Sequence, residues 1–366
     1  MLASLVACEL ALRSFGCDHL FRREHQSAAF LSTNPYWGVW HFANDRVEHG
    51  KSCFDAHYET NDYGMKSPAV RPGAKSIALL GDSFVEGFGN DNEHSVDAVM
   101  RQLLAGRYDV LNFGVSGGFT TIDEVVLYDD FVRYFHPALA VLFFSNYNDL
   151  EENLDPAKSR YIDRDLRLVY PRPRSFEEVV AAVRAPRAAA AARRADRRLC
   201  LGRLYRVAEK AIRLESQMLF NLRWDFRDEL ARPYLAEEDA DMRRSWAIVE
   251  TALGRIRDVA AADATTFVVV DIADPYQLDP NWLRLASVRS RVALDPTHPN
   301  RRLGEICQKL GIAYYDMYPD AKQHLESNRL RFPYLSFSCD RHYSRDGQEL
   351  MGNLVTRYLE ENRLLR

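Results

Sequence analysis

The sequence predicts an α/β fold, a three-layer α/β/α domain built on a parallel sheet, and three observations support this. Apolar runs typical of strands alternate with amphipathic stretches typical of helices from residue 76 onward, which is the pattern of βαβ units. Several runs stop abruptly at polar or glycine-bearing turns, as buried parallel strands do at the edge where ligands bind. The chain has 366 residues, of which 47% are hydrophobic and 27% charged, so it can bury a large core.

The expected elements follow one another in strand–helix order. The strands are Ser76–Leu80, Asp109–Phe113, Leu139–Phe144, Thr265–Ile272 and Ile312–Tyr315. The helices are Ser95–Leu104, Ile122–Phe135, Arg302–Leu310 and Asp346–Leu359. Right-handed crossovers place the carboxyl end of every strand at the same edge of the sheet, so the turns that follow the strands should form one surface.

Further segments precede and interrupt this domain. Residues 1–19 are an apolar N-terminal helix or a truncated membrane anchor, and residues 20–75 are an aromatic-rich extension with short strands. The domain spans residues 76–366 and contains an insertion at about 150–264. In the insertion we expect a hairpin over Tyr161–Tyr170 and an Ala- and Arg-rich helix over Ala181–Leu214.

The N-terminal run Met1–Leu12 is apolar apart from Ser4 and Glu9. It is shorter than the about 20 apolar residues that a spanning helix needs. It also lacks the basic start and the A-x-A site of a signal peptide. Two interpretations remain open: an amphipathic first helix with a Glu9–Arg13 ion pair, or the end of a membrane anchor whose beginning is missing from the sequence.

Charge and cysteine content exclude some classes of protein. The formal net charge of −4 creates no global basic field, so a nucleic-acid partner is not expected. The cysteines form no close pair, so neither a zinc site nor a disulfide framework is indicated. They are Cys8, Cys17, Cys53, Cys200, Cys307 and Cys339.

Four polar segments follow the expected strands or precede the last helix. They are Gly81-Asp82-Ser83, Asn112–Gly118, Asn146–Asp149 and Cys339–Ser344. Each has an ordinary structural explanation, because Ser, Asn and Asp cap helices and glycine permits sharp turns. Together, at one edge of a sheet, they supply a nucleophile, a base, an orienting acid and oxyanion donors, which are the parts that acyl transfer requires.

Ser83 is the expected nucleophile of this set, and His342 is the expected general base, because imidazole titrates near neutral pH. Asp340 stands two residues before His342 and is expected to orient its ring. His298 is the main alternative base. The order Ser, Asp, His without a G-x-S-x-G motif argues against the nucleophile elbow of α/β-hydrolases.

The expected oxyanion donors are the backbone N–H groups of Ser83 and Gly114 and the side-chain amide of Asn148. An asparagine at the end of a strand can direct its amide at a developing negative charge. A glycine in the turn after a strand lets the backbone direct an N–H at a ligand.

At these motifs the chain resembles the SGNH/GDSL hydrolases. Gly81-Asp82-Ser83 is similar to the block of that family that holds the nucleophile, and Asn112–Gly117 to the block with the donor glycine. Asn148-Asp149 is similar to the block with the donor asparagine, and Asp340 with His342 to the last block. The resemblance covers roughly residues 76–149 and 340–359.

The chain departs from the family pattern in two places. Asn146 stands where the third block usually begins with glycine, and the last block reads D-x-H rather than D-x-x-H. The Asp340–Ser344 sequence resembles members of the alginate O-acetyltransferase type and other envelope-linked members. Localisation at a bacterial-type cell envelope, anchored or exported, is therefore favoured over the cytoplasm.

The resemblance implies a flavodoxin-like sheet and a serine esterase that works through an acyl-serine intermediate without metal or organic cofactor. The implied partner is a small acyl ester, such as an acetylated glycan, with Asp82, Asn146 and Tyr147 as substrate-binding residues. Two alternatives remain open: an O-acetyltransferase that uses the same Ser-His-Asp site, and a non-catalytic carbohydrate-binding relative. The oligomeric state is not specified by the sequence.

The basic helix in the insertion also has two interpretations. With the N-terminus it could face anionic lipid, through residues that include Arg193, Arg194, Arg197 and Arg198. Alternatively it forms a lid over Ser83, while Tyr147 and the Trp37/Trp40 region shape a sugar-sized cleft by stacking. We favour the lid, because a basic helix face is usually solvated and the N-terminal run is too short to span a membrane.

Overall fold

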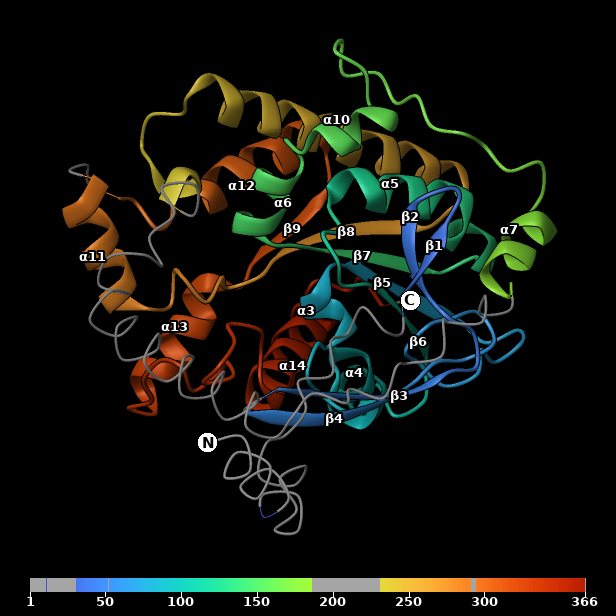
Figure 1. The fold of residues 1–366 in the computed structure, drawn as a ribbon, viewed down its shortest axis with the longest axis horizontal. Coiled ribbons are helices and arrows are strands. Elements are labelled where there is room, and N and C mark those ends of the chain that lie inside the picture. The colour runs from blue at the N-terminus through green and yellow to red at the C-terminus, as the bar shows by residue number, and fades with distance from the viewer. Residues whose placement is uncertain (1–10, 12–30, 52, 186–230, 291–293, 366) are drawn as a thin grey trace.

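The computed structural model describes residue 11 and residues 31–51, 53–185, 231–290 and 294–365 (Figure 1). The expectations for Met1–Leu12 and for most of the helix Ala181–Leu214 lie outside the described residues. Among the described residues, no helix is long and apolar enough to cross a membrane.

The centre of the fold is a parallel sheet of five strands in the order β6-β5-β7-β8-β9. The strands are β5 (Ser76–Gly81), β6 (Asp109–Gly114), β7 (Leu139–Phe144), β8 (Thr266–Asp271) and β9 (Ala313–Asp316). Renumbered along the sheet this is the order 2-1-3-4-5 of flavodoxin-like folds. The structure therefore confirms the predicted fold class, and each expected strand is present within a residue or two.

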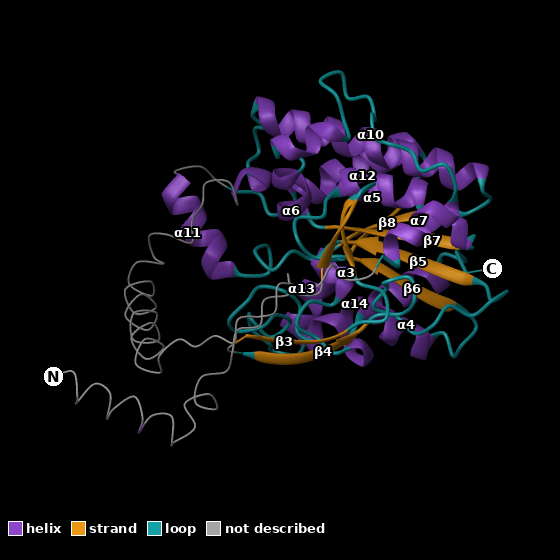
Figure 2. Ribbon diagram, turned by 45° about the vertical axis from the view of Figure 1, so that its right-hand side comes forward, coloured by secondary structure: helices purple, strands orange, loops and turns teal. Residues whose placement is uncertain are grey.

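Helices cover both faces of the sheet (Figures 1 and 2). One layer contains α5 (Thr121–Asp130), α10 (Ala240–Ala262) and α12 (His298–Leu310). The other contains α4 (Val96–Leu103), α13 (Tyr318–Ser327) and α14 (Arg345–Glu361). Side chains of β5 alternate between the two layers: Ala78 and Leu80 belong to one apolar core, and Ile77 and Leu79 to the other. Every residue of β5 is buried, as expected for a central parallel strand.

Shorter elements lie around this framework. The helices are α3 (Ser83–Glu86), α6 (Asn146–Glu152), α7 (Phe176–Val183) and α11 (Pro280–Ser290). The 3-10 turns are η2 (Asn92–His94), η3 (Val132–Phe135), η4 (Pro156–Arg160) and η5 (Arg232–Tyr234). The chain turns back on itself in the insertion as expected, through an antiparallel bridge between Ile162 and Leu168 and a hydrogen bond from the Val169 N–H to the Tyr161 carbonyl at 2.8 Å.

The N-terminal extension forms two antiparallel hairpins. In the first, β1 (Leu31–Asn34) pairs with β2 (Gly38–His41), and in the second, β3 (Arg46–Lys51) pairs with β4 (Phe54–Glu59). Trp37 and Trp40 are fully buried, and both rings pack against Phe131. The expectation that these tryptophans shape a sugar-binding cleft is therefore wrong: they fill the core between the first hairpin and the helical layer.

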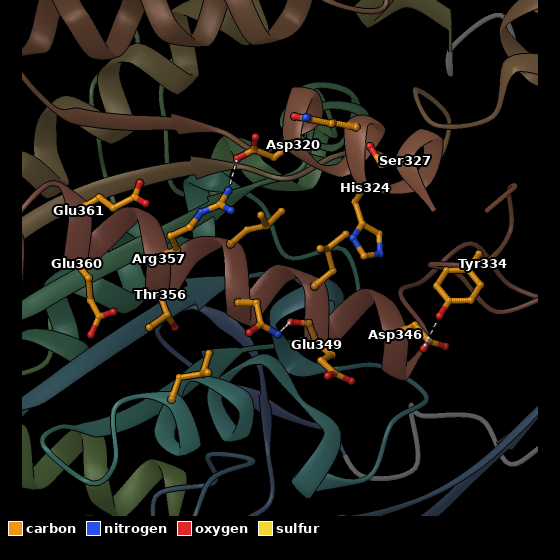
Figure 3. Close-up of a pocket in the computed structure, with 15 residues that line it drawn as sticks. Asp320, His324, Ser327, Tyr334, Asp346, Glu349, Thr356, Arg357, Glu360 and Glu361 are labelled. Atoms are coloured by element: carbon orange, nitrogen blue, oxygen red, sulfur yellow. Dashed lines mark hydrogen bonds and ion pairs between the residues drawn. The ribbon is translucent and has the colours of Figure 1, made fainter. Parts of the chain in front are cut away.

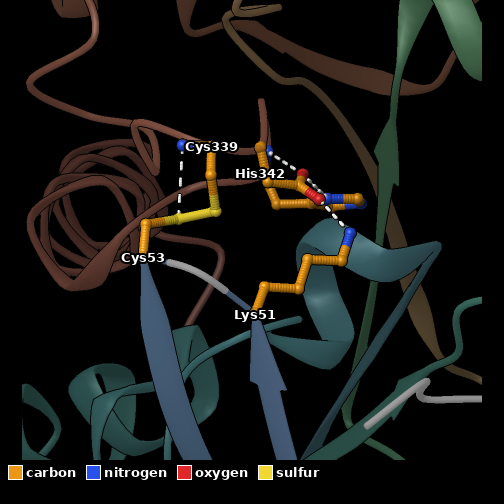
Figure 4. The surroundings of a disulfide bond; sticks show 5 residues. Lys51, Cys53, Cys339 and His342 are labelled. Atoms are coloured by element: carbon orange, nitrogen blue, oxygen red, sulfur yellow. Dashed lines mark hydrogen bonds and ion pairs between the residues drawn. A yellow bond between two sulfur atoms is a disulfide. The ribbon is translucent and has the colours of Figure 1, made fainter. Parts of the chain in front are cut away.

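A disulfide joins the second hairpin to the C-terminal part of the chain. It links Cys53, in the turn between β3 and β4, to Cys339, 286 residues later (Figure 4). This disulfide corrects the expectation that the cysteines indicate no disulfide. Sequence spacing cannot reveal a bond between residues that only the fold brings together. The bond attaches the hairpin to the loop that precedes α14.

Candidate active site

Ser83 lies at the carboxyl end of the central strand. β5 ends at Gly81, whose φ of +158° and close approach to Val85 require glycine: an added Cβ would lie 2.4 Å from Val85 Cγ2. Asp82 caps α3, because its Oδ1 accepts a hydrogen bond from the Phe84 N–H at 2.9 Å. Ser83 is thus the first residue of α3, and its side chain stands at the edge of the sheet.

His342 and Asp340 form a continuous hydrogen-bonded chain with Ser83. His342 Nε2 lies 2.7 Å from Ser83 Oγ, and His342 Nδ1 lies 2.5 Å from Asp340 Oδ1. Burial alone would raise the pKa of Asp340, but the hydrogen bond and charge of His342 and the hydrogen bond from Lys51 hold that pKa well below its usual range. With Asp340 ionised, Nδ1 donates to it, and the lone pair on Nε2 faces the serine hydroxyl.

The loop that carries His342 is fixed by its own backbone and by its neighbour Tyr343. The Phe337 N–H donates to the His342 carbonyl at 3.0 Å. The Asn90 amide donates to the Tyr343 carbonyl at 2.9 Å, and the Tyr343 hydroxyl donates to the Ala273 carbonyl at 2.5 Å. These bonds tie the loop to residues that follow α3 and β8, so the imidazole is held over the serine.

Two features of the site were not predicted from the sequence. Lys51, the last residue of β3, contacts Asp340 through its Nζ and the Oδ2 atom (Figure 4). The disulfide Cys53–Cys339 lies beside this contact, one residue before Asp340. No sequence signal marks either contact, because nearly 290 residues separate the partners.

Asn148 is held by Asp82, the residue that directly precedes Ser83. Its amide nitrogen donates to Asp82 Oδ2 at 2.7 Å. Asp82 is 4% exposed and uses both carboxylate oxygens, for the cap of α3 and for Asn148. Its buried position raises its pKa. Asp82, expected to bind substrate, therefore organises the edge of the site instead.

The adjacent Asp149 has a structural role. Its Oδ1 accepts from the Thr121 N–H at 2.9 Å, and its Oδ2 accepts from the Ser145 N–H at 2.8 Å. It thereby joins the start of α6 to the start of α5. The two residues of the Asn-Asp pair therefore have different contacts: Asn148 binds Asp82, and Asp149 fixes the turn between β7 and α6.

Gly114 does not present its N–H to the serine. That N–H donates to Asn112 Oδ1 at 2.9 Å, and the Asn112 amide donates to the Val85 carbonyl at 2.7 Å. An added Cβ on Gly114 would lie 2.3 Å from the Glu86 nitrogen. The expectation that Gly114 is an oxyanion donor does not agree with these contacts. Glycine is needed here because β6 packs directly on α3.

The remaining predicted residues lie elsewhere. The Asn146 amide is buried and donates to Asp271 Oδ1 at 2.8 Å, so it braces β7 against β8 rather than lining the site. His298 begins α12, and its Nε2 lies 3.4 Å from Glu238 Oε1. The side chain of Tyr147 is outside the described residues.

Two other polar features are separate from the Ser83 site. An open groove of about 870 Å³ runs between α13 and α14, and its lining includes Asp346, Glu349 and Arg357 (Figure 3). Within the described residues, one group of side chains has ligand atoms close enough to share a metal ion, namely Asp91, Glu93 and His94. Neither set includes a residue of the Ser-His-Asp chain.

Comparison with known proteins finds similarity to solved structures. No family model and no curated protein matches the chain. Solved structures similar to it include a putative lipolytic protein of the G-D-S-L family from Desulfitobacterium hafniense DCB-2, with 12% identity, a TM-score of 0.39 and coverage of 77% of this chain and 98% of that one.

Two further similar structures are a lipase/acylhydrolase from Enterococcus faecalis and the acetyl xylan esterase AlAXEase. The first has 13% identity, a TM-score of 0.39 and coverage of 79% of this chain and 96% of that one. The second has 10% identity, a TM-score of 0.40 and coverage of 78% and 99%.

Proposed function

We propose that this protein is a serine esterase that cleaves small acyl esters through an acyl-serine intermediate. The observation that carries the proposal is the hydrogen-bonded chain Ser83 Oγ, His342, Asp340, with distances of 2.7 and 2.5 Å. A serine hydroxyl is a weak nucleophile unless an adjacent base removes its proton. This chain supplies the base and a carboxylate that stabilises the imidazolium formed.

The first half of the reaction forms the acyl-enzyme. Ser83 Oγ attacks the ester carbonyl carbon while its proton passes to His342 Nε2, and the carbonyl oxygen becomes an oxyanion. The tetrahedral intermediate then collapses: the bond to the alcohol oxygen breaks, and His342 gives its proton to the leaving alcohol. Asp340 remains ionised throughout and holds the Nδ1 proton.

The second half repeats these steps with water. Water attacks the acyl carbon and gives a proton to His342 Nε2, and that proton returns to Ser83 Oγ when the acid leaves. The free enzyme is regenerated and no co-reactant is consumed. If a sugar hydroxyl replaced water, the same residues would transfer the acyl group instead, so the identity of the acceptor separates hydrolase from transferase.

Two donors are available for the oxyanion. Among the described residues, no acceptor is found for the Ser83 N–H, one of the free first-turn donors of α3. The Asn148 amide uses one hydrogen on Asp82, and it has a second. Both groups adjoin the nucleophile, and donors fixed in advance are a large part of transition-state stabilisation in acyl transfer.

The substrate class we propose is an acetyl-type ester on a carbohydrate. Its support is the resemblance of the four sequence motifs to SGNH/GDSL hydrolases. This part of the proposal rests on analogy of motifs.

Turnover of p-nitrophenyl acetate, measured with and without a sugar acceptor, tests the proposal. Wild-type protein should release acetate, and Ser83→Ala should lose nearly all turnover, because removing a nucleophile costs many powers of ten. Ser327→Ala, an exposed serine on α13, is the matched control and should retain full activity. Activity of Ser83→Ala within about tenfold of wild type would contradict the assignment. Acetyl transfer to the sugar with little free acetate would identify a transferase.

A further inference from the structure

We propose that Lys51 is a positioning residue of this site, and that it acts on the reaction through Asp340. The inference rests on the proposed function and goes beyond it, because it adds a contact from the N-terminal hairpin to the Ser-His-Asp chain. The hairpin is separated in sequence from Asp340 by almost the whole domain, yet its last β3 residue touches the carboxylate.

The two oxygens of Asp340 have different partners. Oδ1 accepts from His342 twice, from the ring Nδ1 at 2.5 Å and from the backbone N–H at 3.0 Å. Oδ2 is held by the ammonium group of Lys51. A carboxylate bound at one oxygen only can rotate about its Cβ–Cγ bond. Bound at both, it keeps Oδ1 in line with the imidazole.

An exposed lysine–carboxylate pair is normally worth little, because ordering the long side chain costs entropy and water screens the charges. This pair differs from that case. The side chain of Asp340 is 12% exposed and that of Lys51 35% exposed. The Lys51 ammonium also lies 5.0 Å from the centroid of the Phe88 ring, and that ring stacks on the imidazole of His342. The lysine is therefore confined by its surroundings.

The backbones on both sides of the contact are also joined. Lys51 pairs with Phe54 at the end of the β3–β4 ladder. Cys53 lies in the turn between them, and its partner Cys339 directly precedes Asp340 (Figure 4). The disulfide thus keeps the hairpin turn close to the loop that carries Asp340 and His342. Because the two backbones are already held together, forming the Lys51–Asp340 ion pair costs less entropy.

The consequence for the reaction concerns rate rather than binding. Lys51 contacts Oδ2 of Asp340, whereas His342 contacts Oδ1, so Lys51 meets the Ser-His-Asp chain at the carboxylate and not at the serine. Loss of its ammonium would let Asp340 turn and leave the imidazole less well oriented for proton transfer. Substrate would bind as before, so kcat should fall while KM stays the same.

A double-mutant cycle on ester turnover tests this. Lys51→Met should lower kcat on the order of tenfold, in the range of coupling between contacting residues, with KM unchanged. Lys51→Arg should restore most of the rate. In an Asp340→Asn background, Lys51→Met should have little further effect, because the group through which it acts is gone. Lys309→Met is the matched control. Lys309 lies at the C-terminal end of α12 and pairs with Glu250 of α10, away from the site.

The outcomes distinguish this inference from the proposed function. If wild-type protein turns over esters but Lys51→Met keeps wild-type kcat, or lowers it by the same factor in the Asp340→Asn background, the inference is wrong and the esterase assignment stands. If wild-type protein has no ester turnover, the function is wrong. The inference is then judged by the low-field NMR resonance of the proton between His342 and Asp340, which should shift in Lys51→Met but not in Lys309→Met.

Discussion

The ring of Phe88 stacks on the imidazole of His342, with centroids 4.2 Å apart and planes inclined by 27°. Phe84 packs against the same imidazole, at 5.3 Å. These contacts orient the plane of the imidazole, so its two nitrogens can point only toward Ser83 on one side and Asp340 on the other. Packing of the two phenylalanine rings and the hydrogen bonds to Ser83 and Asp340 thus fix the same orientation of the His342 ring.

Replacing each of the two candidate bases, His342 and His298, with alanine should therefore have very different effects on the rate. We expect His342→Ala to lower kcat by about 10⁴-fold or more, because the serine loses its base. His298→Ala should leave kcat within a few-fold of wild type, since His298 is the first residue of α12 and its Nε2 lies 3.4 Å from Glu238 rather than joining the chain of Ser83, His342 and Asp340. Steady-state kinetics on p-nitrophenyl acetate checks both variants. Comparable losses in the two would mean that the base was misassigned.

The sheet and its helices could be predicted from the sequence because each strand is a short, continuously apolar run that ends at polar residues. The stop after β5 also marked Ser83, and the last polar loop marked Asp340 and His342. Local patterns of this kind need only the neighbouring residues. The expectation for the fold is confirmed for that reason.

Features that depend on distant parts of the chain could not be predicted in this way. Lys51 and Cys53 reach the catalytic loop only because the hairpin folds back across the domain. Trp37 and Trp40 resemble a sugar-binding pair in sequence, but the fold places them in the core. The role of Gly114 was misread because a glycine that permits close packing and a glycine that donates an N–H have the same sequence context.

Replacement of Asn148 tests the oxyanion site. Asn148→Ala removes the amide held by Asp82 next to the nucleophile. We expect kcat to fall by roughly 10²–10³-fold with little change in KM, which is the usual effect of deleting one such donor. Thermal unfolding of the variant serves as the control, because a lost fold would lower both parameters. A rise in KM alone would instead mean that Asn148 only binds substrate.

Removal of the disulfide should affect both stability and rate. In the variant with Cys53→Ser and Cys339→Ser, the free energy of unfolding should fall by about 2–4 kcal/mol, because the unfolded chain is no longer cross-linked. The rate should also fall a few-fold, since the hairpin that holds Asp340 is loosened. Denaturant titration and ester turnover measure the two effects. Reductant should reproduce both in wild-type protein and neither in the variant. Wild-type protein that is indifferent to reductant would refute the role given to the bridge.

His49 is a buried histidine that packs against Phe88, the ring that stacks on His342, and its protonation makes the stability of the fold depend on pH. The side chain is 1% exposed, and its Nδ1 lies 2.8 Å from the Tyr58 hydroxyl. Its ring packs edge-on against Phe88. Burial lowers the pKa of His49 to about 4, against the opposing charge of Glu86 and with smaller contributions from the positive charges of Lys51 and Lys66. The folded protein therefore resists a proton that the unfolded chain accepts readily.

Acid stability should show this difference. Between the unfolded pKa of about 6.5 and the folded value of about 4, the unfolded state binds the additional proton, so the free energy of unfolding decreases as the pH falls through this window. The contribution of His49 is fully present above the window and is lost below it. It should amount to on the order of 2 kcal/mol after allowance for solvent screening. His49→Gln cannot take up the proton, so its stability should decline less steeply between these pH values. Denaturant midpoints of both proteins at matched pH give the difference, in which the other titrating groups cancel. Parallel curves for variant and wild type would show that His49 takes up its proton at the same pH in the folded and the unfolded protein.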